Sequence, residues 1–297
     1  MLFQYSQMAD DSTDEASCYA FENLSVHDKQ DDALPQPNNQ VTKSSRPPEH
    51  YSPNLIICDA WYGFPTQKRP RKERIGAVSR QLVNFLQWRL ETNIDRKQFE
   101  VHLLGNQLDV DAVRDRICEI AKDESSISAK YGDEIIFKPN MDIHEAIQQW
   151  RNDNETDEEV VYLSPDASET LLPSSRPPRA VIVGMLIDRR ITSDRSRKRA
   201  EESLNLRAVK LPIEALHVKE MSSDEPLNVD TVMELMQRWW CNCGKLEQQV
   251  RTNTDCISDH KNKYRKCFVE AAAWAMKSHR ERHPNRTVHK EVKEEIK

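Results

Sequence analysis

The stretch that decides the fold reads Val181-Ile182-Val183-Gly184-Met185-Leu186-Ile187-Asp188-Arg189-Arg190. Its apolar run is short enough for a buried strand, and it ends in a carboxylate and two arginines. Open α/β sheets bind their ligands at the carboxyl ends of the strands, so this order predicts an acid and two cations at a binding edge. The alternative from this stretch alone is a core strand whose Asp188 caps the segment that follows.

Short apolar runs alternate with segments of helical periodicity along most of the chain. The runs predict strands over residues 54–59, 99–104, 134–137, 160–163, 181–187 and 208–213. The periodic segments predict helices over residues 71–91, 109–123, 143–150, 194–204 and 228–240. Because the strand candidates are continuously apolar rather than half polar, we expect an α/β fold with a mostly parallel sheet and helices on both faces.

Charge and composition divide the chain of 297 residues into three parts. Residues 1–50 hold nine Asp/Glu against three Lys/Arg, so they carry the whole net charge of −6, and we predict a disordered acidic tail. Residues 51–240 are the predicted α/β domain. Residues 241–297 are predicted to be a basic helical extension, with one amphipathic helix over residues 264–276.

Several classes of protein are disfavoured. No run approaches the ~18–20 apolar residues of a membrane span, so we expect no membrane association. The first residues fit neither a signal peptide nor a mitochondrial transit peptide. The chain lacks a glycine-rich dinucleotide fingerprint, a phosphate loop and a His-Glu-x-x-His motif, and its six glycines are too few for a glycine-built phosphate cradle.

The seven cysteines are odd in number and widely scattered, which favours free thiols in a reducing compartment. The nearest approach to a metal motif is Cys241-x-Cys243 followed by Cys256-x-x-x-His260. Four such ligands can close a tetrahedral zinc site, but the first pair lacks the usual gap of two residues. We therefore expect no bound metal.

Two stretches are strongly basic. Residues 67–74 hold five Lys/Arg against one acid, and residues 189–199 hold six against Asp194 alone. Each stretch fits either a solvated helix or a surface that contacts phosphates.

A cluster of residues lies at the ends of several predicted strands, namely Asp59, Ser164, Asp166, Gly184, Asp188 and the Leu211-Pro212 turn. Five segments form one pattern in their order and spacing. They are Val161-Tyr162-Leu163-Ser164-x-Asp166, Val181-x-Val183-Gly184-x-x-Ile187-Asp188, the basic helix, Ala208-x-x-Leu211-Pro212-Ile213 and Leu227-Asn228-Val229-x-x-Val232. This pattern resembles the tRNA purine-9 N1-methyltransferase family of the SPOUT class. The resemblance covers roughly residues 52–240, including Asp59, Tyr62 and the Lys72-to-Leu82 helix.

The resemblance implies a C-terminal trefoil knot that binds S-adenosyl-L-methionine, largely through backbone groups. It implies a cofactor site at Leu163, Ser164, Gly184, Asp188, Ala208, Leu211, Ile213, Asn228 and Val232. The substrate would be guanine or adenine at tRNA position 9. Guanine N1 carries a proton, so its methylation needs a base, and Asp188 matches the family's candidate; adenine N1 has a free lone pair.

The resemblance also gives the basic stretches a role, since a tRNA or precursor tRNA substrate is held largely through its phosphates. The residues expected at the RNA backbone are Lys68, Arg69, Arg71, Lys72, Arg74, Arg189, Arg190, Arg195, Arg197, Lys198 and Arg199. Position 9 lies in the folded core of tRNA, so we expect recognition of shape and removal of the base from its stack.

This sequence departs from the family pattern at three places. Met185 stands where a second glycine is frequent, Thr192-Ser193-Asp194 replaces a Gly-Leu-Thr-like segment, and Asp230 replaces an asparagine. The bulk of Met185 is expected to crowd the cofactor pocket. Met185 and the Leu204-Asn205-Leu206 turn resemble the family's mitochondrial branch, whose members also serve in protein-only ribonuclease P beside a short-chain dehydrogenase and a nuclease subunit.

Three readings follow. The first is an S-adenosylmethionine-dependent tRNA methyltransferase, mitochondrial by resemblance, with nucleus or cytoplasm as the alternative location. The second is a non-catalytic scaffold that presents precursor tRNA to a nuclease. The third is an acidic-tailed α/β domain with no role in RNA biology.

Overall fold

The computed structural model describes residues 53–62, 64–92, 98–123, 134–186, 194–213, 227–252 and 260–282. The chain divides into two compact units, Met1–Glu49 and His50–Lys297, and all described residues lie in the second. The predicted acidic tail therefore lies outside the described residues.

A seven-stranded sheet organises the second unit. Its strands are β1 (Asn54–Asp59), β2 (Phe99–Gly105), β3 (Ile136–Pro139), β4 (Val160–Leu163), β5 (Glu169–Thr170), β6 (Ala180–Gly184) and β7 (Ala208–Lys210). They pair in the order β3-β2-β1-β6-β4-β7-β5, and every pairing is parallel. The stretch quoted first thus supplies β6, which lies at the centre of the sheet between β1 and β4.

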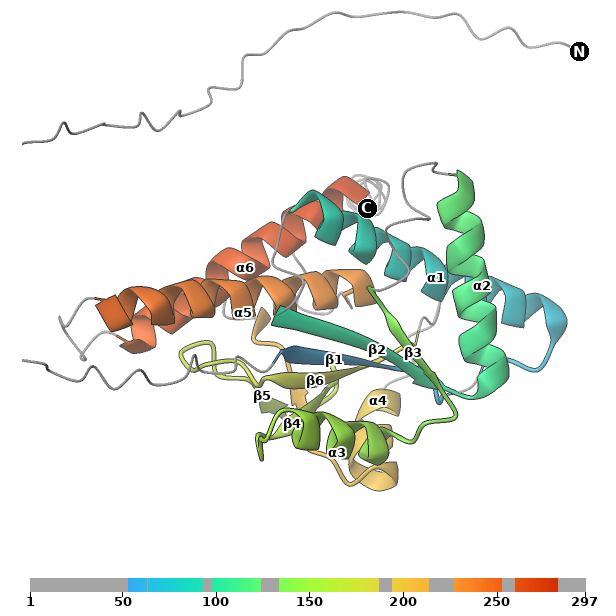
Figure 1. The fold of residues 1–297 in the computed structure, drawn as a ribbon, viewed down its shortest axis with the longest axis horizontal. Helices are drawn as coiled ribbons and strands as arrows, with labels where there is room; N and C mark the ends of the chain where they lie inside the picture. Colours follow the sequence, from blue (N-terminus) through green and yellow to red (C-terminus); the bar gives the residue numbers. More distant parts are fainter. Residues whose placement is uncertain are drawn as a thin grey trace, which may run out of the picture. The chain divides into compact units, whose positions relative to one another are not determined.

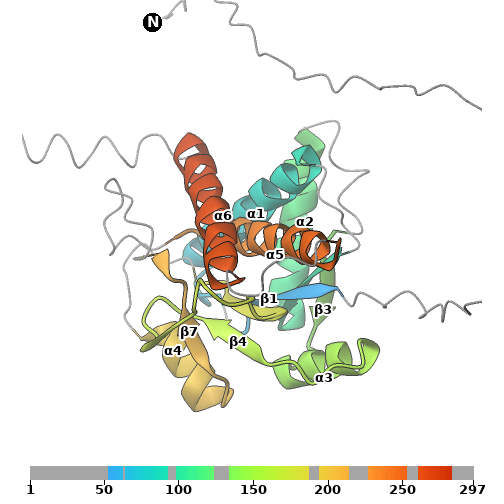
Figure 2. The same cartoon turned by 90° about the vertical axis from the view of Figure 1, so that its left-hand side faces the viewer.

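The helices are α1 (Lys68–Glu91), α2 (Gln107–Asp123), α3 (Ile143–Asp153), α4 (Arg195–Lys198), α5 (Val229–Thr252) and α6 (His260–Arg282), and a π-helical turn (Arg199–Ser203) follows α4. Figures 1 and 2 show α1, α2, α5 and α6 over one face of the sheet and α3 and α4 over the other. This confirms the predicted parallel sheet with helices on both faces.

Two apolar cores fill the space between these layers, one on each face. Successive strand residues point to opposite faces, so Ile56 and Cys58 join the core beneath α1 and α5, whereas Leu55 and Ile57 join the core beneath α3. The continuously apolar sequence of each central strand follows from this arrangement, because both of its faces are buried.

The strand predicted over residues 134–137 is displaced to Ile136–Pro139, and the one predicted over residues 208–213 ends at Lys210. Larger differences occur at β5 and at α4. The two-residue strand β5 pairs with β7 at the edge of the sheet, and its sequence Glu169-Thr170 has no apolar run that would predict it. The helix predicted over residues 194–204 is a four-residue α-helix followed by the π-helical turn. In that wider turn Ala200 is buried and the Arg199 side chain reaches Asp59 on β1.

The C-terminal helices are continuous with the main core. The boundary predicted at residue 240 falls inside α5, and α6 packs against α5 through Trp239 and Phe268, whose ring centroids are 4.8 Å apart. Among the described helices, none is long and apolar enough to cross a membrane. The described residues do not show the predicted C-terminal trefoil knot, since residues 187–193 and 214–226 lie outside them, so the knot stays a prediction.

Candidate functional site

The carboxyl ends of β1, β6, β4 and β7 form the candidate site. Because these strands are parallel neighbours, their ends meet at one edge of the sheet. In the register, Asp59 pairs with Gly184, and Leu163 pairs with both Val183 and Val209. The structure therefore brings together polar residues that the sequence placed after separate strands.

Asp59 is a fully buried carboxylate at the end of β1. Its Oδ1 accepts a hydrogen bond from the Trp61 backbone N–H at 2.9 Å, and its Oδ2 accepts from the Tyr162 hydroxyl at 3.1 Å and from Arg199 Nε at 3.2 Å. Burial raises the pKa of the Asp59 carboxyl above its usual range, and the charge of Arg199 opposes that rise. Asp59 thereby ties β1, β4 and the turn after α4 into one network.

Two tyrosines extend this network towards Gly184. The hydroxyls of Tyr62 and Tyr162 are 2.8 Å apart and share a hydrogen bond. A Cβ atom at residue 184 would lie 2.9 Å from the Tyr162 hydroxyl and 3.0 Å from a ring carbon of Tyr62, so only glycine lets the pair approach β6 this closely. Burial raises the pKa of both phenols, which remain protonated donors at neutral pH.

Two arginines lie over the Tyr62 ring. The guanidinium carbons of Arg195 and Arg199 are 5.6 and 5.9 Å from its centroid. Such contacts are favourable because the face of an aromatic ring attracts a cation. Tyr62 therefore contacts the first residue of the short basic helix α4 and the first residue of the π-helical turn that follows it.

The loop after β4 also contacts α4, through hydrogen bonds of Ser164 and Asp166. The Ser164 hydroxyl lies 2.7 Å from that of Ser196, and the Asp194 backbone N–H donates to Asp166 Oδ2 at 2.8 Å. Asp194 has a φ of 63°, a left-handed conformation that aspartate adopts more readily than most residues. Ser164, predicted at the cofactor, and Asp166 are thus anchors of the basic helix in this structure.

The other predicted cofactor residues lie around the strand ends and the start of α5. Gln81 Oε1 of α1 accepts from the Val229 N–H at 2.8 Å, which fixes the start of α5 just after Asn228. Leu163 is buried, and three partly buried side chains pack against the same core, namely those of Leu211, Ile213 and Val232. Ala208 lies in the core of the opposite face.

Partly exposed apolar side chains at the strand ends suit the apolar parts of an adenosyl group, so these residues fit the expected cofactor.

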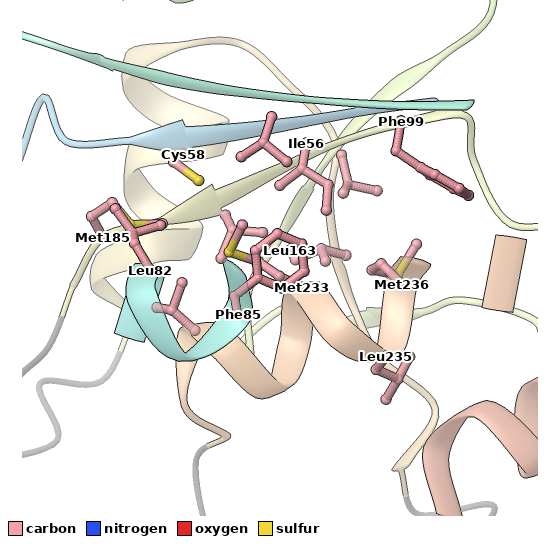
Figure 3. Close-up of a cluster of buried hydrophobic side chains, with 14 of the residues drawn as sticks. Ile56, Cys58, Leu82, Phe85, Phe99, Leu163, Met185, Met233, Leu235 and Met236 are labelled. Atoms are coloured by element: carbon pink, nitrogen blue, oxygen red, sulfur yellow. The ribbon is translucent and has the colours of Figure 1, made fainter. Parts of the chain in front are cut away.

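Met185 is a core residue. Its side chain is 2% exposed and belongs to the same cluster as Cys58 and Leu82 (Figure 3), and its backbone N–H donates to the Asp59 carbonyl at 2.9 Å.

The predicted base Asp188 and its neighbours Arg189 and Arg190 lie outside the described residues. Their roles therefore stay predictions. The nearest described residues before them are Met185 and Leu186, which directly follow β6.

The predicted RNA-contacting cations separate into two groups. Arg71 pairs with the buried Asp109 at 2.5 Å and Arg199 pairs with Asp59, so both support the fold. The second group comprises the other described cations, whose side chains are exposed or, like those of Arg71 and Arg199, partly exposed, namely Lys68, Arg69, Lys72, Arg74, Arg195, Arg197 and Lys198. Arg69 and Arg197 form surface ion pairs with Glu73 and Asp194, which cost little to break.

Sequence reasoning treated Tyr162 only as a strand residue and did not pair Arg199 with Asp59. A signal for Tyr162 was present, because a phenol inside an otherwise apolar strand needs a hydrogen-bond partner. The partner itself could not be read from the sequence, since Asp59 precedes Tyr162 by 103 residues.

The weak zinc motif is only partly described. The structure describes the side chains of Cys241 and Cys243 on α5, whereas Cys256 lies outside the described residues. Within the described part of the chain, no three His, Cys, Asp or Glu side chains are grouped so that they could hold a metal.

Comparison with known proteins adds to this geometry. Residues 116–251 match the family model described as tRNA (guanine(9)-N(1))-methyltransferase TRM10/TRM10A. No match was found among curated proteins. A crystal structure of full-length spTrm10 with SAH is 17% identical, covering 74% of this chain and 97% of that one, with a TM-score of 0.45.

A dual-specific Trm10 from Thermococcus kodakaraensis is also 17% identical, covering 63% of this chain and 90% of that one, with a TM-score of 0.39. At these TM-scores the assignment rests on the family model. The matched segment contains β4, β6, β7 and most of α5, whereas β1, with Asp59, and Tyr62 of the candidate site lie outside it. This segment is therefore similar to the tRNA (guanine(9)-N(1))-methyltransferase family over a little under half of the chain.

Proposed function

We propose that this protein methylates N1 of a purine, guanine or adenine, at position 9 of tRNA and uses S-adenosyl-L-methionine as the methyl donor. The observation that carries the proposal is the family match over residues 116–251, which spans the ends of β4, β6 and β7 and the start of α5. The polar network at the same edge of the sheet supports it, because buried, hydrogen-bonded groups at strand ends are typical of α/β binding sites.

S-adenosyl-L-methionine would supply an electrophilic methyl group. The chain would hold its apolar parts with Leu163, Leu211, Ile213 and Val232 and its polar parts with backbone groups near Gly184 and Asn228. The Gln81 contact supports this role, because it fixes the first turn of α5 beside these residues.

Asp188 is the proposed base. Guanine N1 carries a proton at neutral pH, so a carboxylate that accepts it lets the nitrogen lone pair attack the methyl group. Adenine N1 already has its lone pair, and there Asp188 would only orient the base. The nearby Asp59–Arg199 pair and the tyrosines would hold the end of β6 in place.

The tRNA backbone would contact the exposed cations at the start of α1 and on α4, together with Arg189 and Arg190. Lys68, Lys72 and Lys198 are exposed, so they can reach phosphates without breaking the fold. Arg71 and Arg199 would act indirectly, by holding α1 and α4 in position.

The test uses purified protein, methyl-labelled cofactor and two transcribed tRNAs that differ only in carrying guanine or adenine at position 9. We expect label at N1 of position 9 in at least one of them. Asp188→Asn should lower guanine methylation by about 100-fold or more and adenine methylation far less. Asp153→Asn, at the exposed end of α3, is the matched control and should leave both rates unchanged.

Equal losses on both purines would refute the role of Asp188 as base. No methylation of any tRNA despite cofactor binding would refute the enzyme. Calorimetry distinguishes the enzyme from the non-catalytic scaffold. Salt-sensitive binding of tRNA without any binding of the cofactor would favour the scaffold.

We also propose a trefoil knot, a mitochondrial location, and assembly with a short-chain dehydrogenase and a nuclease as ribonuclease P. The support is the resemblance of Met185 and Leu204-Asn205-Leu206 to the mitochondrial branch of the family. Cell fractionation tests the location, and reconstitution of precursor-tRNA cleavage from the three proteins tests the assembly. Recovery in the nucleus or cytosol alone would contradict the location.

A further inference from the structure

A stack of three side chains crosses the helical face of the molecule, away from the candidate site. The guanidinium carbon of Arg238 on α5 lies 4.9 Å from the ring centroid of Trp88 on α1 and 4.6 Å from that of Trp274 on α6. Trp88 is buried, whereas Trp274 is 56% exposed. The stack therefore begins in the core and ends in an exposed indole ring.

Ion pairs hold the middle of this stack in place. Arg238 Nε pairs with Glu234 at 3.3 Å, and Glu234 also pairs with Arg282 at 3.1 Å. The Glu234 carboxylate is 1% exposed, so the pairs are shielded from solvent and strongly oriented. Trp274 thus rests on an immobilised cation and not on a mobile surface side chain.

Helix α6, which carries Trp274, has an excess of basic residues along its length. Helix α6 carries seven Lys/Arg against two Glu over residues 260–282. Four of its cations are exposed, namely Lys261, Arg265, Lys266 and Lys277. Lys266 and Lys277 form exposed ion pairs with Glu270 and Glu281, which cost little to break. Lys277 Nζ lies 5.7 Å from the centroid of the Trp274 ring. An exposed aromatic ring among cations is the combination with which proteins hold single-stranded nucleic acid, since bases stack on the ring and phosphates contact the cations.

We propose that Trp274 is a stacking platform for an unpaired nucleobase and that the exposed cations of α6 hold the adjoining RNA backbone. This surface, the α6 platform, consists of Trp274, Lys261, Arg265, Lys266 and Lys277. It would contact part of the RNA away from the methylated base. The proposal rests on the proposed function only in taking RNA as the ligand.

Charge favours RNA over a protein partner. Among the large apolar side chains of α6, only Val269 is exposed together with Trp274. These two side chains offer far less apolar surface than a stable protein interface needs. Phosphates, in contrast, match the excess of cations, and the unpaired bases of tRNA loops and precursor ends can stack on an open ring.

The test measures binding of the full chain to a transcribed tRNA and to a short unstructured RNA by fluorescence anisotropy at several salt concentrations. Trp274→Ala should weaken binding by about 5- to 100-fold, and Trp274→Phe should retain most of the affinity because a ring remains. Changing Lys261, Arg265 and Lys266 together to Gln should lower the slope of log affinity against log salt by about 2.

The matched controls lie on α2, where Leu108 is 76% exposed and Arg116 is partly exposed. Leu108→Ala and Arg116→Gln should leave RNA binding unchanged. Every variant should keep one cooperative thermal transition. Trp274→Ala should melt slightly below the wild type, because it loses the contact of the ring with Arg238, and the other variants should match the wild type.

The outcomes separate this inference from the proposed function. Wild-type methylation of tRNA combined with unchanged RNA binding in Trp274→Ala would overturn the α6 platform alone. A wild-type chain that binds no RNA would overturn both proposals. Unchanged RNA binding in Trp274→Ala together with loss of a protein partner would assign the surface to protein instead.

Discussion

Asp59 shows how one residue can organise a site through its burial. It lies at the end of a central strand and accepts hydrogen bonds from a backbone amide, a tyrosine and an arginine. Removing a carboxylate from water is costly, and the Arg199 charge offsets only part of that cost, so the pKa of Asp59 is raised. Because its pKa is raised, Asp59 makes the free energy of unfolding depend on pH.

In the unfolded chain Asp59 ionises near its ordinary pKa of about 4. Because the folded-state pKa is higher, the contribution of Asp59 to stability is fully present below about pH 4 and is lost as pH rises through the folded pKa. We expect the free energy of unfolding of the wild type, relative to Asp59→Asn, to fall between pH 4 and pH 8. Urea denaturation of the wild type and of Asp59→Asn at pH 4 and at pH 8 measures this change. If the wild type instead became more stable relative to Asp59→Asn as the pH rises, the raised pKa of Asp59 would be contradicted.

Gly184 lies directly against the side chains of Tyr62 and Tyr162, which leave no room for a Cβ atom. Gly184→Ala should lower the free energy of unfolding by about 1–3 kcal/mol, because the new methyl group overlaps the Tyr162 hydroxyl. In a Tyr162→Phe background that hydroxyl is absent, and the same substitution should cost at least about 0.5 kcal/mol less. Strictly additive effects in this double-mutant cycle would show that the two residues do not compete for space.

At the scale of elements, apolar periodicity was sufficient for the central strands and the long helices. It was insufficient for β5, which has two polar residues and exists because Val209 and Lys210 offer an edge to pair with. It also missed the break after Lys198, because the π-helical turn depends on contacts of Arg199 and Ala200 with the sheet rather than on local helix preference.

The contact between α5 and α6 should dominate the stability of the C-terminal helices. Phe268 is fully buried against Trp239, so Phe268→Ala should cost about 3–5 kcal/mol. Val269→Ala, at the next residue and 37% exposed, is the control and should cost less than about 0.5 kcal/mol. Thermal and urea unfolding measure both. Similar costs for the two variants would mean that α6 is not packed as described.

At the scale of the whole molecule, α6 and the second half of α5 belong to the compact unit that contains the sheet. Ending the chain at Trp240 removes Phe268, whose ring packs against Trp239, together with the other buried residues of α6. We expect this truncated chain to lose cooperative thermal unfolding.

The control for that truncation is a chain that begins at His50, the first residue of the second unit. It should unfold at the temperature of the full chain, as followed by circular dichroism. A cooperative transition in the chain that ends at Trp240 would support the boundary predicted there from the sequence.

The sequence by itself determined the order of strands and helices, the parallel class of the sheet and the resemblance to a methyltransferase family, because each depends on residues close together in the chain. Only the tertiary structure decided that Arg199 pairs with Asp59, that Tyr162 requires a glycine at residue 184, and that Arg238 joins two tryptophans. These contacts join residues far apart in the chain, and side-chain hydrogen bonds and ring contacts follow from strand register and helix packing, which local sequence does not specify.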